Sequence, residues 1–133
     1  MDDLDKQILM ELEKNAREPF LQIAKKVKVS EGTIRKRVSD MMKQGLIKKF
    51  TVEVSGNVSA IIGIQTNPHV KTKEIVKRLK DLKVTRIFEL TGRFDILCYL
   101  SSYSLENVNV IIEEIRAIEG INHTETFTVL NEE

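Results

Sequence analysis

The residues best suited to chemistry in this chain are basic side chains crowded into one segment. From Lys25 to Lys49 there are nine Lys and Arg, and only Glu31 and Asp40 oppose them. Residues 1–50 carry twelve Lys and Arg against eight Asp and Glu, a net +4, whereas the rest of the chain carries nine against twelve, a net −3. This asymmetry indicates a surface for an anionic polymer, or else a solvated basic face that binds nothing.

Four of these nine cations lie on one predicted helix, from Ser30 to Gln44. Ser30 is a typical cap because its hydroxyl accepts from a free amide in the first turn, and Gly45 is a typical stop. Helical spacing predicts a buried face made of Ile34, Val38, Met41 and Met42. At about 100° per residue, the outward face carries Gly32, Lys36, Ser39 and Lys43, with Arg35 and Arg37 on its flanks. A basic helix with no side chain at its leading tip fits a groove walled by phosphates.

Two helices are predicted to precede this one. Asp2 and Asp3 favour a helix start, and the apolar face of the first helix comprises Leu4, Ile8, Leu9 and Leu12. Residues 15–18 break the pattern, Pro19 suits the first position of a second helix, and its apolar face comprises Phe20, Ile23, Ala24 and Val27. Only Lys28, Val29 and Ser30 connect the second helix to the third. Such tight spacing is typical of a three-helix winged or helix-turn-helix domain, predicted over residues 1–50.

The hydrophobic period changes after Gly45. Residues 46–54 read as a strand, and 51–57 are predicted to form a hinge between domains. Strands are then predicted at 58–66, 84–91, 95–102 and 121–130, with helices near 72–82 and from a cap at Ser104 to Gly120. The fold class is therefore α+β, and residues 58–133 form a ferredoxin-like βαββαβ domain. Because its helices cover only one face of an apolar sheet, a second copy is the simplest cover for the other face, which predicts a dimer.

The predicted DNA contacts are the outward residues of the third helix and its cap: Ser30, Gly32, Thr33, Arg35, Lys36 and Arg37. Lys and Arg supply most of the binding free energy by neutralising phosphates, and only the leading end of the helix reaches base edges. Gly32, Thr33 and Lys36 are predicted nearest the bases, Arg35 at a base or phosphate, and Ser30 at a phosphate besides its capping role. Two such helices about 34 Å apart would bind a roughly palindromic operator.

Several of these residues have an alternative role within the domain. Gly32 brings backbone close to the groove floor, or is a tolerated glycine that costs the helix about 1 kcal/mol relative to Ala. Arg37 lies nearer the buried side, so an internal ion pair is as well supported as a DNA contact. Glu31 is predicted to interact with the positive end of the helix dipole, in preference to accepting a hydrogen bond from a cytosine amine. Lys48 and Lys49 are predicted either to contact the DNA backbone or to be solvated lysines of a strand.

Four stretches carry a resemblance to a known family: LDKQILMELEKNAR, PFLQIAKKVKVSEGTIRKRVSDMMKQGLIKKF, TGRFDILCYL and IEGINHTETFTVL. Together, in this order, they resemble the Lrp/AsnC (feast/famine) family of microbial transcription regulators over nearly the whole chain. The resemblance implies DNA-binding dimers, often assembled into octamers, and a C-terminal domain that senses an amino acid or a related small effector. This chain departs from the family pattern at the hinge between Val54 and Ser59, which is shorter than usual and lacks the common Asn-Pro…Gly stretch.

The resemblance also implies the effector contacts: Thr91, Gly92, Arg93, Asp95, Thr124 and Thr126. Gly92 permits a positive φ, so that backbone amides and Arg93 meet a carboxylate while Asp95 meets an ammonium. The alternatives are that Asp95 only caps the turn, that Arg93 pairs with Asp95 or Glu89, and that the threonines are ordinary strand residues. Several family members have a small or acidic residue where this chain has Arg93, so the identity of the effector does not transfer.

An enzyme is the main rival hypothesis, since some proteins resembling this family are sirohaem decarboxylases that bind a tetrapyrrole through histidines. Only His69 and His123 are present here, which is weak support. A third alternative is a DNA-binding assembly module without a ligand. The single Cys98 suits a buried thiol in a reducing cytosol. No spacing of Cys and His predicts a metal site, no cofactor is expected, and no apolar run predicts a membrane span, so we expect a cytoplasmic protein.

Overall fold

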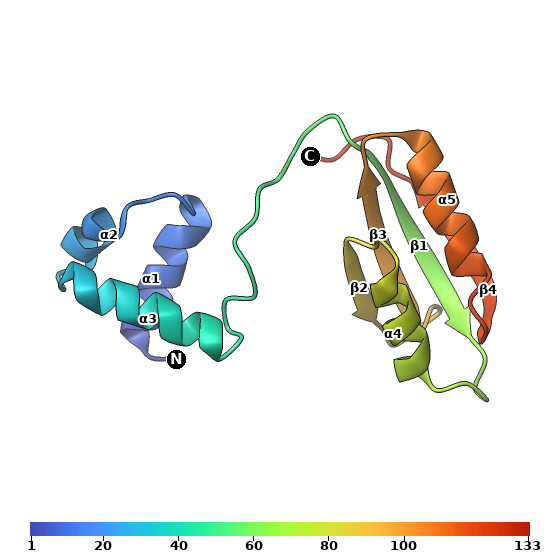
Figure 1. Ribbon diagram of the computed structural model, residues 1–133, viewed down its shortest axis with the longest axis horizontal. Coiled ribbons are helices and arrows are strands. Elements are labelled where there is room, and N and C mark those ends of the chain that lie inside the picture. Colours follow the sequence, from blue (N-terminus) through green and yellow to red (C-terminus); the bar gives the residue numbers. More distant parts are fainter. The chain divides into compact units, whose positions relative to one another are not determined.

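The chain folds into two compact units, Met1–Glu53 and Val54–Glu133. The computed structural model describes residues 1–133 (Figure 1). The division between the units falls inside the predicted hinge at 51–57. None of the five helices has the length and apolar character needed to cross a membrane.

Three helices make up the first unit, as predicted: α1 (Asp3–Lys14), α2 (Phe20–Val27) and α3 (Glu31–Lys43). A capping box starts α1, because the side chains of Asp2 and Asp5 each accept from the backbone amide of the other. Pro19 is the residue before α2 and not its first residue. Lys28 follows α2 in the left-handed conformation, with φ 60°, and this reversal turns the chain toward α3 within three residues.

The ends of α3 are set by local sequence. Ser30 caps its start by accepting from the amide of Thr33. At the other end Gly45 has φ 75°, and the amides of Gly45 and Leu46 donate to the carbonyls of Met42 and Met41. This double closure is a Schellman motif, which needs a residue tolerant of the left-handed region at the glycine position. The predicted helix limits are confirmed.

One small core joins the three helices, and it comprises Ile8, Leu12, Ile23, Ala24, Ile34, Val38, Met41 and Ile47. The predicted buried face of α3 is correct except for Met42, which is exposed. Met41 already fills the core at this turn, and the next residue lies about 100° further round the helix, away from α1 and α2.

The predicted strand at residues 46–54 is wrong, and the first unit has no wing. A strand needs a neighbour to satisfy its backbone amides and carbonyls, and the four strands of the second unit pair only with one another. Ile47 packs into the first core instead. Phe50, Val52 and Val54 keep the alternating pattern that suggested a strand, but they are exposed, Val52 by 79%.

The second unit has the predicted βαββαβ order: β1 (Val58–Thr66), α4 (Thr72–Asp81), β2 (Arg86–Glu89), β3 (Ile96–Ser102), α5 (Leu105–Arg116) and β4 (Ile121–Thr128). The strands form one antiparallel sheet in the order β2-β3-β1-β4. The edge strand β2 is shorter than the predicted 84–91, because only its four residues have partners on β3. β3 begins one residue later than predicted, and β4 ends two residues earlier.

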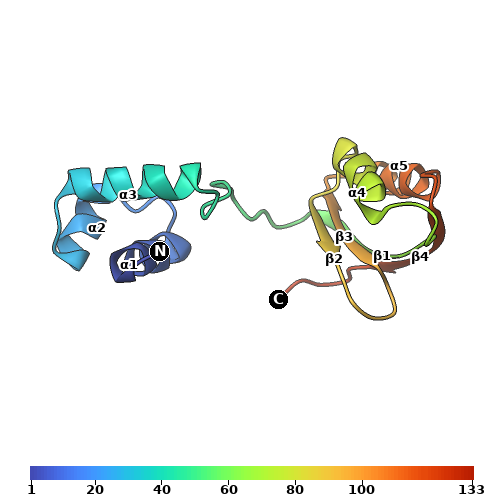
Figure 2. The same cartoon turned by 90° about the horizontal axis from the view of Figure 1, so that it is seen from below.

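Both helices lie on the same face of this sheet (Figures 1 and 2). The core between them comprises Ala60, Ile62, Ile64, Ile75, Leu79, Ile96, Cys98, Leu100, Val108, Ile111 and Ile115. The alternate residues of the strands point to the other face, which no helix of the unit covers. Two aromatic side chains on that face remain exposed, Phe88 by 37% and Phe127 by 46%. The predicted one-sided sheet is therefore confirmed.

Candidate functional site

The outer face of α3 is a continuous exposed strip. Gly32, Lys36, Ser39 and Lys43 are exposed along it, and Arg35 is exposed on its flank. The opposite side of the helix is buried in the core of the first unit through Ile34, Val38 and Met41. The helix is thus held firmly by one side while its polar side stays free.

The leading end of α3 is closed by two hydroxyl groups. The hydroxyl of Ser30 accepts from the amide of Thr33 at 3.2 Å and lies 2.8 Å from the hydroxyl of Thr33. A Cβ added at Gly32 would meet only the Ser30 hydroxyl, at 4.0 Å. Nothing in the fold of this unit therefore requires a glycine at this position.

Arg35 and Lys36 each have an acidic partner one helical turn away. The guanidinium of Arg35 donates to Glu31 at 2.8 Å, and its Cζ lies 5.4 Å from the centre of the Phe20 ring, at the start of α2. The ammonium of Lys36 lies 3.4 Å from Asp40. The sequence pattern did not reveal the role of Phe20, because nothing in the spacing shows which residue of α2 lies beside α3.

Arg37 is half-buried and forms the internal ion pair that was one of its two predicted roles. Its guanidinium donates to Asp2 and to Asp5, the latter at 3.2 Å. These hydrogen bonds raise the pKa of Arg37, and the same guanidinium lowers the pKa of the Asp2 carboxyl. The contact ties the capping box of α1 to the middle of α3.

The predicted effector turn connects β2 to β3. Thr91, Gly92 and Arg93 are exposed, and Gly92 has φ 123°. Asp95 is half-buried and accepts from the amide and the hydroxyl of Thr66, at 2.7 and 3.1 Å. Asp95 thus fastens the turn to the end of β1, which is close to the capping role considered as its alternative.

Aromatic packing fastens the same turn to the open face of the sheet. The ring of Phe94 lies directly over Gly63 of β1, where an added Cβ would stand 2.7 Å from ring carbons. Arg93 extends over this ring, with its Cζ 5.6 Å from the centroid, and pairs with Glu125 of β4 at 3.4 Å. Its ion-pair partner is therefore Glu125, and neither Asp95 nor Glu89.

Thr124 and Thr126 lie on the opposite face of the sheet from Arg93 and Phe94 of this turn. They lie opposite Ile64 and Ile62, whose side chains are fully buried under the helices, so both threonines face the helix side of the sheet. Thr124 accepts from Arg116 of α5 at 3.4 Å. Glu125 lies between them on the open face. Strand alternation in the sequence separates Glu125 from the threonines, but it does not say which set faces the turn.

Groups with other chemistry lie apart from both regions. Burial raises the pKa of the Cys98 thiol to about 12, as suits an inert core residue. His69 and His123 are exposed. No group of three or more His, Cys, Asp or Glu side chains is arranged to hold a metal ion.

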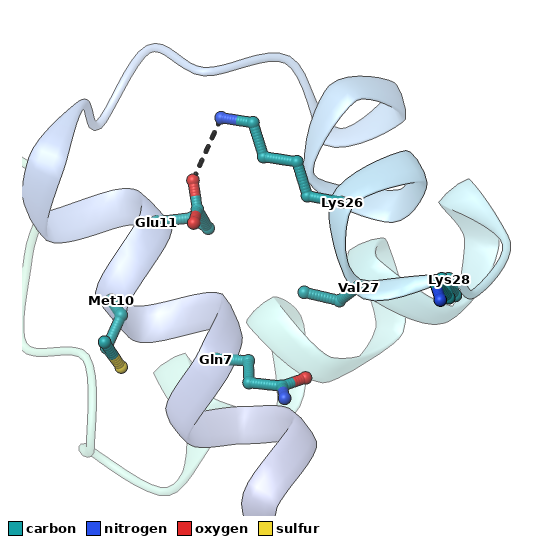
Figure 3. Close-up of a pocket in the computed structure, with 6 residues that line it drawn as sticks. All are labelled: Gln7, Met10, Glu11, Lys26, Val27 and Lys28. Atoms are coloured by element: carbon teal, nitrogen blue, oxygen red, sulfur yellow. Dashed lines mark hydrogen bonds and ion pairs between the residues drawn. The ribbon is translucent and has the colours of Figure 1, made fainter.

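A cavity of about 370 Å³ lies between α1 and α2, and it is lined by Gln7, Met10, Glu11, Lys26, Val27 and Lys28 (Figure 3). Lys26 spans its rim and donates to Glu11 at 3.0 Å, and it also pairs with Glu18 at 3.2 Å. These contacts lower the pKa of Glu11 and raise that of Lys26. None of the predicted site residues lines this cavity, and two of its charged groups, Glu11 and Lys26, are already paired with each other.

Comparison with known proteins gives the same two-part division. Residues 1–42 match the AsnC-type helix-turn-helix domain, and residues 59–133 match the Lrp/AsnC ligand binding domain. The HTH-type transcriptional regulator LysM of Sulfurisphaera tokodaii is 38% identical over 133 residues, which cover 98% of this chain and 95% of that protein. LysM of Saccharolobus solfataricus is 39% identical, with 98% of this chain and 94% of that protein covered.

Solved structures agree in fold. Escherichia coli AsnC has a TM-score of 0.75 and 32% identity, with 99% of this chain and 93% of that chain covered. The Neisseria meningitidis transcriptional regulator NMB0573, solved as a complex with L-Met, has a TM-score of 0.79 and covers 99% of this chain and 91% of its own. At 18% identity, the second comparison shows the fold alone.

Proposed function

Because the chain belongs to the Lrp/AsnC family of transcriptional regulators, we propose that the outer face of α3 binds the major groove of a specific, roughly palindromic operator. One observation carries this proposal: α3 is anchored in the core by one side while Gly32, Arg35 and Lys36 are exposed on the other. A helix presented in this way supplies phosphate contacts along its length and base contacts at its leading end. The curated relatives are named transcriptional regulators, so the protein is a regulator and not a tetrapyrrole-binding enzyme.

Gly32→Ala tests the groove contact by moving stability and DNA affinity in opposite directions. Because the fold leaves room for a Cβ, we expect the change to stabilise the first unit by about 0.4–1 kcal/mol. Yet a methyl group at the helix tip keeps the backbone from the groove floor, so operator affinity falls. Urea unfolding and fluorescence anisotropy on an operator selected from random duplexes measure the two effects. Ser39→Ala, on the same face but further from the tip, is the control, and unchanged affinity in Gly32→Ala would leave the residue as a tolerated glycine.

The second part of the proposal is that the C-terminal unit binds an amino acid or a related small effector at the turn from Thr91 to Asp95. The match of residues 59–133 to a ligand binding domain supports this. Arg93 of this turn and Glu125 of β4 present opposite charges 3.4 Å apart. A zwitterion offers a carboxylate to Arg93 and an ammonium to Glu125 in exchange for this pair. Thr124 and Thr126, on the helix side, are the weaker members of the proposed site.

A thermal-shift screen against the common amino acids tests the effector. A ligand that binds only the folded protein stabilises it by mass action, by about 2.7 kcal/mol at a hundred times its dissociation constant. We expect one or a few amino acids to raise the melting temperature, and Arg93→Ala to abolish the shift while the control Lys83→Ala retains it. If no amino acid shifts the melting temperature of the wild type, the C-terminal unit of this DNA-binding protein serves mainly assembly, or its effector is not an amino acid.

The third part is a homodimer, capable of further assembly, built on the open face of the sheet. Phe88 and Phe127 are exposed there, and Ile61 and Leu97 lie half-buried between them. A second copy seated on this face would cover all four side chains. It would also bring a second α3 to the operator, which a roughly palindromic site requires.

A further inference from the structure

Both acidic residues of α3 form ion pairs with basic residues of the same helix. Glu31 pairs with Arg35 across one turn at 2.8 Å, and Asp40 pairs with Lys36 across one turn at 3.4 Å. These are the two carboxylates that interrupt the run of nine basic residues between Lys25 and Lys49. The face proposed to bind DNA is therefore partly neutralised before any DNA arrives.

Arg35 is held more tightly than an exposed ion pair alone would hold it. One guanidinium nitrogen, Nη2, donates to Glu31, while the guanidinium lies over the ring of Phe20 with its carbon 5.4 Å from the ring centre. A carboxylate fixes one edge of the planar group, and an aromatic face restricts its tilt. The remaining N–H groups of the fork stay free to donate.

The Glu31 carboxylate has opposite effects on the two possible DNA contacts of Arg35, a phosphate and a base edge. A phosphate close to Arg35 would also lie close to the Glu31 carboxylate, so like-charge repulsion opposes that contact. The edge of a guanine presents neutral acceptors, which the free side of a fixed guanidinium can meet with two parallel hydrogen bonds. A carboxylate at this position thus penalises contact with the DNA backbone while orienting the arginine for a base.

We infer that Glu31 is a specificity-determining residue, which holds Arg35 against Phe20 for contact with a base edge and withholds it from phosphates on non-specific DNA. Phe20 is a positioning residue in the same device. The inference rests on the proposed function, because it assumes that the outer face of α3 enters the groove. It assigns to Glu31 a role in addition to its favourable place at the positive end of the helix dipole.

The test measures the binding of Glu31→Gln to two duplexes by fluorescence anisotropy over a range of salt concentrations. One duplex is an operator selected by the wild-type protein from a random pool, and the other has the same bases scrambled. Glutamine keeps the shape of the side chain but releases Arg35. We expect affinity for the scrambled duplex to rise about two- to fivefold per helix, which is the worth of an exposed ion pair. The salt slope on that duplex steepens by about 0.9 per helix as one more phosphate is contacted.

Operator affinity is expected to stay level or fall, so that the ratio of operator to scrambled affinity drops. Phe20→Leu, which removes the aromatic face but keeps an apolar side chain against the core of the first unit, should lower the same ratio. The control is Glu13→Gln, an identical charge change on the exposed surface of α1 away from α3. If Glu31→Gln changes the affinity for both duplexes equally, and by the amount seen in Glu13→Gln, the inference is overturned. The proposal that α3 binds DNA would be unaffected by that result. A wild-type protein that selects no duplex would instead overturn the proposed function itself.

Discussion

Replacing Arg35 or Lys36 by Ala is expected to weaken operator binding by at least about tenfold, because a charged contact is lost and costs about 1–3 kcal/mol. A dimer presents each residue twice, so the loss applies at both half-sites. Neither side chain contributes to the core of the first unit, and both are exposed. The melting temperature and the oligomer size should therefore remain those of the wild type.

The two variants should differ in kind. Arg35→Ala removes the group held by Glu31 and Phe20, so it should relax discrimination at one base position of each half-site. Lys36 was predicted near the bases, but its ammonium pairs with Asp40 and lacks the aromatic contact that orients Arg35. Lys36→Ala should therefore weaken all duplexes about equally and flatten the salt slope by about 0.9 per helix. Anisotropy titrations against the operator and single-base variants separate these outcomes. Lys80→Ala, an exposed lysine of α4, is the control, and wild-type affinity in both α3 variants would remove α3 from the interface.

Phe127→Asp is expected to dissociate the protein into monomers at micromolar concentration. Phe127 lies opposite Ile61 on the open sheet face, on the edge strand β4 of the surface assigned to the second copy. A carboxylate there would lose its hydration on association without gaining a partner, which opposes the dimer strongly. In the monomer the side chain is 46% exposed, so the same change should do little harm to the isolated fold.

Light scattering coupled to size-exclusion chromatography measures this change directly. Operator affinity should fall with it by two orders of magnitude or more, because the two helices no longer bind as one linked unit. Val110→Asp is the matched control, since Val110 is an exposed apolar residue on α5, away from the open face. A Phe127→Asp protein of unchanged mass would place the dimer interface elsewhere.

The helices, most strand positions and the division into two parts were predictable from the sequence because they follow from short-range rules. Ser30 and Ser104 cap helices through hydroxyls that reach amides within the same turn, and Gly45 stops α3 because it adopts a positive φ. Periods of 3.6 and 2 mark the faces that must be buried. The outward position of Arg35 and Lys36 follows from the same arithmetic, so the exposed face of α3 was predicted almost entirely.

What the sequence did not predict, or left open, depended on partners distant in the chain. Residues 46–54 carry a strand pattern, yet a pattern does not supply the neighbouring strand that pairs with it. Asp95 was predicted either to meet a ligand or to cap its turn, and one of its carboxylate oxygens accepts from Thr66, twenty-nine residues earlier. The sheet register puts Thr124 and Thr126 on the helix side and Glu125 beside Arg93.

The sequence by itself determined that this chain holds a basic recognition helix on a three-helix unit, followed by a one-sided βαββαβ sheet. Both follow from local capping and from the periodic burial of apolar residues. Only the tertiary structure decided how the polar groups of the two regions are used: Arg37 pairs with α1, Arg35 lies on Phe20, and Arg93 reaches Glu125. A charged side chain pairs with whatever the fold brings within about 4 Å, and that neighbour is set by packing and register, which no local pattern records.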